Sequence, residues 1–466
     1  MRPLQLVWLR QDLRINDNPA LEQASKQGLV VCLYIETAKQ HQAHDESVAK
    51  QSFRLACLQQ LKSQLNQLNI PLIYRETDDF KSVAGVIEKL VEQHSIAALH
   101  FNREYPLNEK QRDDEVCELL KNKVSIQHYD GDLALEPSQL KTLQGQSYRV
   151  FTPYKKAWIK QFLMQGLSLA RGPQTQKFDL SSVKQNDIAL MDKHRNDLWP
   201  AGDLEALERL DSFEKKIPSY GNHRDFPSIN GTSGLSPYLA VGAISVKQCI
   251  AKLMKKNIQH GDFSEDDMLS HVWLSELIWR EFYRQILIDN CSTLSKHKPF
   301  KNKPENWIYG EIAVQRFEAW KNAKTGFPLI DAAMLQLKKT GWMHNRLRML
   351  SAMFLTKLCL VDWRWGEKYF MQQLIDGDFA SNNGGWQWCA STGADAAPYF
   401  RIMNPITQSK KFDQEGLFIK RFLPSLAELS PKEIHCPNAE QRQSCGYPQP
   451  IIDYPEARKE ALRVLA

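Results

Sequence analysis

Short apolar runs alternate with longer amphipathic segments over the first 130 residues of the chain. This alternation is typical of β-α-β units around a parallel sheet, in which helices cover the strands. The apolar runs predict strands at Leu4–Leu9, Leu29–Ile35, Pro71–Arg75, Ala98–Asn102 and Val124–Tyr129. Apolar residues three and four apart predict helices at Ser47–Leu68, Ser82–His94 and Asn108–Lys123. The pattern therefore predicts a doubly wound α/β domain at residues 1–130.

The pattern changes twice after this domain. Residues 131–200 are polar with isolated glycines, and they predict a long interdomain linker. Residues 201–466 show few strand-like alternations and predict a mostly helical domain. Its longest helical windows are Glu265–Asn290, Phe327–Leu360 and Gly366–Ile375. We therefore expect an α/β domain, a linker and an all-α domain.

Composition adds only a few constraints. The formal net charge of +6 permits an anionic partner but does not require one. Nine cysteines without a CxxC pair argue against a disulfide framework and against a metal site, and favour buried, reduced thiols. Charges at Arg10, Asp12 and Arg14 do not fit a signal peptide, and no apolar stretch of about 18 residues follows. We expect a cytoplasmic monomer.

The segment from Asp376 to Arg401 holds the most informative mixture of side chains in the chain. Its acids and amides can hydrogen-bond the ring and ribose groups of a flat ligand, its glycines let backbone approach the ligand, and its tryptophans can wall it. These residues are Asp376, Asp378, Asn382, Asn383, Gly384, Gly385, Trp386 and Trp388. An irregular loop packed by aromatic rings is the plain alternative. The mixture resembles the flavin-binding signature of the photolyase and cryptochrome family.

The resemblance extends over nearly the whole chain, from LVWLRQDLRIND near the N-terminus to FDQEG at residues 412–416. Within the family it points to the class I cyclobutane pyrimidine dimer photolyases of the folate type. It implies a lyase that repairs UV-damaged DNA by light-driven electron transfer from FADH⁻ to a flipped-out dimer, photolyases being among the enzymes known to extrude their target base. It also implies a methenyltetrahydrofolate antenna, with 8-hydroxy-5-deazaflavin as the alternative.

The turn at residues 230–239, NGTSGLSPYL, carries hydroxyl and backbone N–H groups that can hold phosphate oxygens, although an N-cap followed by proline explains it equally well. The resemblance implies that this turn binds the FAD pyrophosphate and that Tyr220 makes a second cofactor contact. Many family members carry a basic residue where this chain has Gly234. One phosphate contact is therefore expected to be missing.

Trp273, Glu276 and Arg280 recur at intervals of three and four residues and share one face of a predicted helix. A glutamate among tryptophans is either a salt-bridged core acid or a functional acid with a raised pKa, and the sequence alone favours neither. The resemblance implies that Glu276 hydrogen-bonds the pyrimidine dimer and favours protonation of its radical anion. It also implies that Trp279 packs on the dimer and that Arg280 faces the cofactor.

The motif GWMHNRLRML places Asn345 and Met349 on one helix face and Arg348 on another, as a solvated cationic helix end also would. The resemblance implies that Arg348 pairs with Asp376 beside the isoalloxazine ring, while Asn345 and Met349 touch the dimer. A histidine pair replaces part of this motif in (6-4) photolyases. Met349 therefore favours cyclobutane dimers. Asn382 matches the amide beside flavin N5 that photolyases use.

Three tryptophans match the family's electron relay to photoexcited flavin: Trp386, Trp363 and Trp307. Core packing is the plain alternative for each. Because the segment around Trp307 differs in length from the family pattern, Tyr309 could end the relay instead. For the antenna, Asn108 and Glu109 match folate contacts, although helix capping explains them equally well, and Lys296 matches a further contact.

These matches define three sets of expected site residues. The catalytic residues are Glu276, Asn382, Trp386, Trp363 and Trp307. The cofactor-binding residues are Tyr220, Thr232, Ser233, Gly234, Leu235, Ser236, Trp273, Arg280, Asn345, Arg348, Asp376, Asp378, Asn382, Asn108, Glu109 and Lys296. The DNA-binding residues are Arg224, Glu276, Trp279, Asn345, Arg346, Met349, Trp388, Arg401, Lys410 and Lys411, with phosphate contacts from the basic members. The alternatives are a cryptochrome-type signalling flavoprotein, a (6-4) photolyase and, least favoured, a redox flavoenzyme of another class.

Overall fold

A computed structural model of the chain describes residues 2–177, 179, 183–191, 195–258, 263–301 and 305–465, with backbone alone at 256–258. The chain divides into two compact units. The first unit comprises Met1–Lys215 and Ser233–Ser295, and the second comprises Lys216–Thr232 and Lys296–Ala466. The domain boundaries expected near residues 130 and 200 do not coincide with this division, and they stay a prediction.

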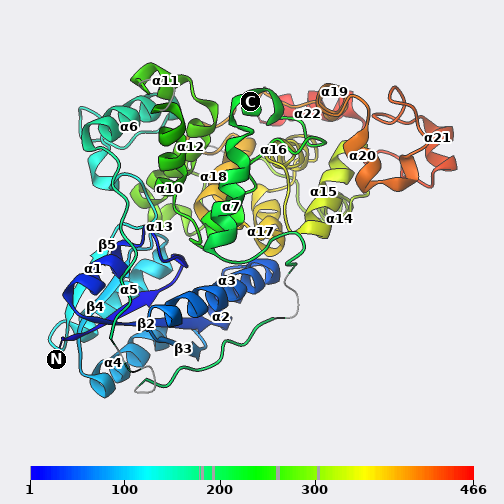
Figure 1. Cartoon of the computed structure of the whole chain (residues 1–466). Coiled ribbons are helices and arrows are strands. Elements are labelled where there is room, and N and C mark those ends of the chain that lie inside the picture. Colours follow the sequence, from blue (N-terminus) through cyan, green and yellow to red (C-terminus); the bar gives the residue numbers. More distant parts are fainter. Residues whose placement is uncertain are drawn as a thin grey trace. The chain divides into compact units, whose positions relative to one another are not determined.

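The first unit is built on a parallel sheet, as predicted (Figure 1). In the described part of the chain, five strands lie in the order β3-β2-β1-β4-β5. The inserted order, with β1 between β2 and β4, is that of a doubly wound fold. The strands are β1 (Leu4–Leu9), β2 (Leu29–Thr37), β3 (Leu72–Thr77), β4 (Ile96–Asn102) and β5 (Ser125–Tyr129). Each begins and ends within two residues of its predicted bounds.

Helices cover this sheet and fill the rest of the first unit. Leu6 and Trp8 of β1 share a buried core with Ile87 of α4 and Val116 of α5, as alternation along a strand requires. The helices are α1 (Pro19–Gln27), α2 (Ala38–Ala43), α3 (Val48–Gln67), α4 (Val83–His94), α5 (Leu107–Leu120), α6 (Phe151–Gln165), α7 (Asp203–Glu214), α9 (Ser236–Ala240), α10 (Val246–Ile258), α11 (Glu265–Ser270), α12 (Val272–Asp289) and α13 (Cys291–Leu294).

The stretch expected to be an interdomain linker contains a helix. Helix α6 buries Phe151, Tyr154, Trp158, Ile159 and Phe162, which recur at three and four residues. That spacing predicts an amphipathic helix, which the expectation of a linker did not include. Residues 178, 180–182 and 192–194 of the expected linker lie outside the described residues.

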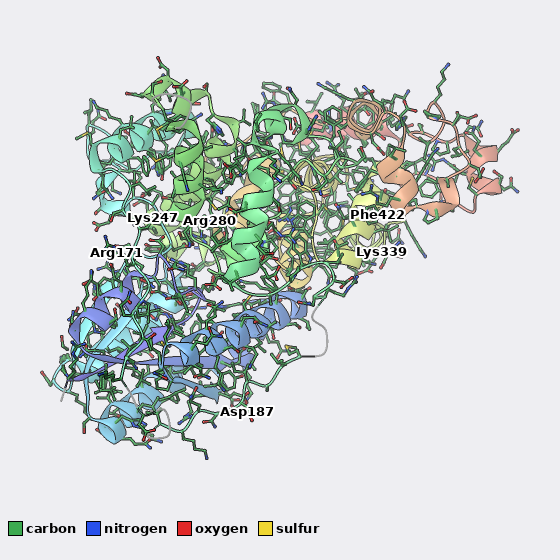
Figure 2. All side chains as sticks on the ribbon, viewed as in Figure 1. Arg171, Asp187, Lys247, Arg280, Lys339 and Phe422 are labelled. Atoms are coloured by element: carbon green, nitrogen blue, oxygen red, sulfur yellow. The ribbon has the colours of Figure 1, made fainter. Side chains whose placement is uncertain are left out.

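The second unit is helical. Its helices are α8 (Tyr220–His223), α14 (Glu311–Lys321), α15 (Pro328–Thr340), α16 (Asn345–Met353), α17 (Trp363–Gln373), α18 (Phe379–Ala390), α19 (Pro405–Phe412), α20 (Leu417–Phe422), α21 (Ala439–Ser444) and α22 (Tyr454–Val464). A π-helical turn, Phe354–Leu358, continues α16. Helices α15 and α20 pack together, and Lys339 lies over the Phe422 ring at 5.9 Å (Figure 2).

Two of the long helical windows are interrupted. His271 separates α11 from α12, and its ring accepts the Leu274 N–H at the start of α12. Gly341 ends α15 with φ +67°, a left-handed conformation that glycine adopts readily. His344 then caps α16 by accepting the Arg346 N–H. Local capping residues thus divide into separate helices two windows that the apolar spacing alone predicts as continuous helices.

The structure also shows whether any described helix could span a membrane and what state the cysteines are in. None of the helices in the described ranges combines the length and apolar character that crossing a bilayer needs. The nine cysteines all fall in those ranges and are free thiols. Five of them are buried as expected, whereas Cys436 is exposed.

Candidate active site

An ion pair joins the turn before α18 to α16 in the second unit. Arg348 Nη2 donates to Asp376 Oδ2 at 2.7 Å, which is the pairing predicted from the sequence. The other carboxylate oxygen, Asp376 Oδ1, is buried and has no hydrogen-bond partner among the described residues. An unsatisfied buried oxygen is costly, so this atom is suited to a ligand N–H or O–H. Asp378, two residues on, caps α18 by accepting the Ser381 N–H at 2.8 Å.

The two asparagines of α18 are held by one buried acid on α17. Asn382 Nδ2 donates to the Glu367 backbone oxygen at 2.9 Å, and Asn383 Nδ2 donates to Glu367 Oε1 at 2.9 Å. Glu367 is 1% exposed, and its other oxygen lies 2.8 Å from His297 Nδ1. Because the amide nitrogen of Asn382 is engaged, its orientation is fixed and its oxygen remains the end that can accept from a ligand.

Glycines of this region lie in helices α17 and α18. Gly384 and Gly385 lie inside α18, a regular helix that runs from Phe379 to Ala390. Gly366 of α17 instead allows α17 and α18 to meet, because a Cβ there would lie 2.0 Å from the Trp386 ring. Gly366 thus serves the packing of two helices, and the ligand approach expected at Gly384 and Gly385 stays a prediction.

The three relay tryptophans lie in one core of the second unit. Trp386, Trp363 and Trp307 are 2%, 0% and 7% exposed, whereas Tyr309 is 66% exposed. Trp363 Nε1 and Trp307 Nε1 both donate to Glu305 Oε1, at 3.1 and 3.2 Å. One carboxylate oxygen thus bridges the last two members of the expected relay.

In the first unit, α12 carries residues expected to contact the lesion, Glu276 and Trp279, and one expected to bind the cofactor, Trp273. Trp273 and Trp279 contact other rings: Trp273 packs edge-on against Phe213, and Trp279 stacks on Phe151 with ring centroids 3.7 Å apart. Glu276 is half-buried and lies in the field of Lys155.

Arg280, which is labelled in Figure 2, pairs with Asp132, a residue that the sequence did not single out. Its Nη1 donates to the Asp132 backbone oxygen at 3.0 Å, and its Nη2 pairs with the Asp132 carboxylate. Arg284 pairs with the same carboxylate. Asp132 thus anchors two arginines of α12 and leaves Arg280 in one defined orientation.

The glycine of the hydroxyl-rich turn faces an arginine of α7. Gly234 has φ +63°, and a Cβ there would lie 2.8 Å from Arg209 Nη1. The guanidinium of Arg209 also lies over the Trp199 and Tyr238 rings. A cation from α7 therefore lies beside the turn that lacks the basic residue usual in the family. Ser233 and Ser236 lie in this first unit, whereas Thr232 and Tyr220 belong to the second.

Basic side chains gather around Asp225 and Phe412 in the second unit. Arg346 pairs with Asp225 at 2.7 Å, and Arg224 lies 3.9 Å from the same carboxylate. Arg346 and Lys411 both lie over the Phe412 ring. Lys410 lies on α19 beside Lys411 and is exposed. Asn345 and Arg401 are exposed as well. Three of the predicted phosphate contacts are thus neighbours.

The predicted folate residues meet a histidine that the sequence reasoning missed. His44 Nε2 lies 2.8 Å from Asn108 Nδ2, and His44 Nδ1 lies 3.5 Å from Glu109. Burial raises the pKa of Glu109 to about 7 and lowers the pKa of His44. Lys296 belongs to the second unit, so its part in this site stays a prediction.

Similarity to known proteins agrees with this geometry. A family model of the FAD-binding domain of DNA photolyase matches residues 273–466, and a DNA photolyase model matches residues 5–175. The deoxyribodipyrimidine photo-lyase of Escherichia coli strain K12 is 41% identical over 469 residues, covering 98% of this chain and 97% of that protein.

Solved structures show the same likeness. A bacterial class III photolyase from Agrobacterium tumefaciens has a TM-score of 0.85 at 31% identity and covers 100% of this chain and 97% of its own. A cryptochrome from Synechocystis sp. PCC6803 has a TM-score of 0.85 at 25% identity, with 99% of both chains covered. The fold and site define a flavoprotein with a photolyase-type FAD-binding domain. The chain belongs to the DNA photolyase family.

Proposed function

We propose that this chain is a deoxyribodipyrimidine photo-lyase, which uses light and FAD to reverse cyclobutane pyrimidine dimers in DNA. The observation that carries the proposal is the Arg348–Asp376 pair with its unpartnered buried oxygen, in a chain that matches photo-lyases almost end to end. The direct test is repair of a thymine dimer oligonucleotide by the photoreduced protein in blue light and in darkness.

The described residues fit a reduced flavin. Asp376 Oδ1 offers an acceptor for a ring or ribose donor, and Arg348 offers positive charge beside an anionic ring. Asn382 presents its carbonyl oxygen, which suits an N–H group rather than a bare ring nitrogen. When bound, the reduced flavin supplies the photoexcited electron that splits the dimer and receives it back afterwards.

The lesion is proposed to contact Glu276, Trp279, Asn345, Met349 and Trp388. Asn345 is exposed at the first turn of α16, and Met349 follows it one turn later on the same face. Glu276 hydrogen-bonds the dimer and favours protonation of its radical anion as negative charge develops. Met349, rather than a histidine, supports a cyclobutane substrate over a (6-4) photoproduct.

The basic cluster at Arg224, Arg346 and Lys411, with Lys410 and Arg401, is proposed to bind phosphates on both sides of the lesion. These contacts are independent of base sequence and supply affinity rather than recognition. Arg346 is already oriented by Asp225 and by the Phe412 ring, which reduces the entropy lost when it binds DNA.

The FAD pyrophosphate is proposed to lie on the turn at Thr232, Ser233, Gly234, Leu235 and Ser236. Arg209 supplies the cation that the turn itself lacks. Arg209 of α7 would thus make the phosphate contact that Gly234 cannot make. Tyr220, Trp273, Arg280 and Asp378 complete the proposed cofactor set.

For the antenna we favour methenyltetrahydrofolate over a deazaflavin, with contacts from His44, Asn108, Glu109 and Lys296. Asn108 and Glu109 are gathered by His44, and the raised pKa of Glu109 lets it donate or accept at neutral pH. At the carboxyl ends of β1 and β4, where such sheets usually bind ligands, Asn102 is instead engaged with Asp12.

We propose that electrons reach the flavin through Trp386, Trp363 and Trp307. Glu305 would stabilise the positive charge that this transfer leaves on Trp363 or Trp307.

A cytoplasmic monomer remains our expectation. A signalling role like that of cryptochromes would use the same flavin pocket, and it is the outcome to be preferred if FAD binds but no lesion is repaired.

A further inference from the structure

A lysine lies completely buried in the second unit. Lys357 is 0% exposed and sits in the π-helical turn Phe354–Leu358, which continues α16. Lysine is almost never fully buried unless its ammonium group is paired, since removing the charge from water is costly. Lys357 is not one of the proposed catalytic residues, so we expect hydrogen-bond acceptors in the fold to compensate the burial of its ammonium group.

The partners of Lys357 are three backbone carbonyl groups from one short segment. Its Nζ donates to the oxygens of Pro398 at 3.0 Å, Tyr399 at 3.4 Å and Arg401 at 3.1 Å. These bonds use all three N–H groups of an ammonium. One side chain thus collects the carbonyls of a segment that forms no helix or strand.

No opposite charge compensates Lys357 within the described residues. The groups that act on it are Arg401, a like charge, and Cys389 of α18, a thiol whose own pKa burial raises to about 12. The pKa of Lys357 is lowered to about 8, chiefly by burial; Cys389 opposes the shift and Arg401 adds to it. Among the described residues, the hydrogen bonds that hold the ammonium group come from the three carbonyl oxygens.

The segment held by Lys357 is a tight turn. The Arg401 N–H donates to the Pro398 oxygen at 2.9 Å, which makes Tyr399 and Phe400 the central residues. Its carbonyls face Lys357. The Phe400 side chain is 60% exposed, and Arg401 is exposed as well. The turn presents an aromatic ring and a guanidinium outward, a pairing suited to stacking on a base and binding a phosphate.

The π-helical turn explains how Lys357 reaches these carbonyls. The Cys359 N–H bonds to the Phe354 oxygen at 2.9 Å, five residues back. The extra residue changes the direction in which the following side chains project, and such turns recur at functional sites. The same continuous helix begins at Asn345 and carries Met349. Lys357 therefore links the proposed lesion-contact helix to the turn that exposes Arg401.

We propose that Lys357 is a positioning residue for DNA binding: it fixes the Pro398–Arg401 turn so that Phe400 and Arg401 meet the DNA beside the lesion. The inference rests on the proposed function, because it requires that the protein bind damaged DNA. Lys357 itself touches no substrate and acts through the turn alone.

The test is affinity in the dark for a thymine dimer oligonucleotide, measured by fluorescence anisotropy on FAD-loaded protein. Lys357→Met keeps the side-chain length but removes the three donors. We expect about tenfold weaker binding, the effect of losing one hydrogen bond to a charged group. Lys338→Met, which removes an exposed lysine that bonds Asn322, is the matched control and should leave affinity within about twofold.

A double-mutant cycle separates positioning from general damage. If Lys357 acts through the turn, adding Lys357→Met to Phe400→Ala/Arg401→Ala weakens binding no further. Fully multiplicative losses, or unchanged affinity in a Lys357→Met protein that retains FAD, would overturn the inference. If wild-type protein showed no preference for dimer DNA, the proposed function itself would be wrong. This result is distinct from a failure of the positioning role of Lys357, in which wild-type protein still prefers dimer DNA.

Wild-type protein alone provides a second readout should the variant not fold. As pH rises from about 7.5 to about 9.5, across the lowered pKa of Lys357, deprotonation removes one of the three donated bonds, so affinity for dimer DNA should fall. The same titration stabilises the fold, because the unfolded lysine still binds its proton in this range. Affinity and stability moving in opposite directions supports positioning, whereas affinity that follows stability, or does not change, contradicts it.

Discussion

Trp363 and Trp307 donate their indole N–H groups to the same oxygen, Glu305 Oε1, at 3.1 and 3.2 Å. A negative charge at hydrogen-bond distance from two indoles lowers the energy of a positive charge on either ring. Arg364 pairs with Glu305 at 2.8 Å and so offsets part of this effect, most strongly at Trp363, whose ring centroid lies 4.8 Å from its guanidinium. The two charges together favour the hole on Trp307, the last ring of the proposed relay.

Glu305→Gln keeps an acceptor oxygen but removes the charge. We expect blue-light photoreduction of bound FAD, with an external thiol as donor, to slow at least about threefold. Repair by protein already reduced with dithionite should not change, because that reaction does not use the relay. Glu311→Gln, an exposed acid of the same unit, is the control. Equal photoreduction rates in both variants would rule out a role for Glu305.

Asp376→Asn should release FAD. The substitution removes the charge that pairs with Arg348 and weakens the acceptor at Oδ1. We expect FAD affinity to fall about tenfold to a hundredfold, the range for a hydrogen bond to a charged group. Recovery of FAD fluorescence on serial dilution measures the loss. Unchanged retention would mean that Asp376 does not face the cofactor.

Arg209→Ala should weaken FAD binding by about tenfold, as removal of a charge-assisted phosphate contact would. It should also open the space beside Gly234, which Arg209 Nη1 now fills. Adding Gly234→Arg to this variant should then restore part of the affinity, despite the cost of a side chain at φ +63°. In wild-type background the same Gly234→Arg change should instead weaken binding. Equal effects of Gly234→Arg in both backgrounds would contradict the assignment.

The stability of the protein should depend on Glu281. Burial raises the pKa of Glu281 to about 7, although its oxygens accept the Ala134 N–H. An acid whose folded pKa is raised stabilises the fold below its unfolded pKa, and this contribution is lost as pH rises through the folded value. Glu281→Gln should therefore raise the unfolding free energy at about pH 8 by about 2 kcal/mol relative to wild type, and much less at about pH 5. Urea unfolding at both pH values measures this, and a constant difference would argue against it.

Neutralising Lys410 and Lys411 together should weaken binding to damaged and undamaged DNA alike. The slope of log affinity against log salt should become shallower by about one to two, because fewer phosphate contacts form and fewer counterions are released on binding. Titrations between low and moderate salt give the slope. An unchanged slope would remove both lysines from the DNA surface.

Much of the fold could be predicted from apolar spacing. The five strands were located within two residues because a short continuous apolar run between turn residues is typical of a strand buried on both faces of a parallel sheet. Helix α6 was missed although Tyr154, Trp158 and Phe162 carry helical spacing, because the polar residues around it dominated the interpretation. Caps such as His271 act through single side-chain bonds, which spacing does not reveal.

The site was predicted only in part, for a physical reason. Arg348 and Asp376 could be paired from the family motif, and their ion pair forms. Glu367 and His44 were missed because each contacts side chains distant in sequence. Glu305 was missed because its role is to join Trp307, its neighbour in sequence, to the distant Trp363. Glu367 left one signal: an acid one helical turn after Trp363 lies on a face that is otherwise apolar.

The central claim is repair, and one measurement tests it most directly. Purified, photoreduced protein is mixed with a thymine dimer oligonucleotide and, separately, with a (6-4) oligonucleotide, in blue light and in darkness. We predict that only the cyclobutane dimer is restored and only in light. A protein that binds FAD yet restores neither lesion would contradict the account and favour a signalling flavoprotein.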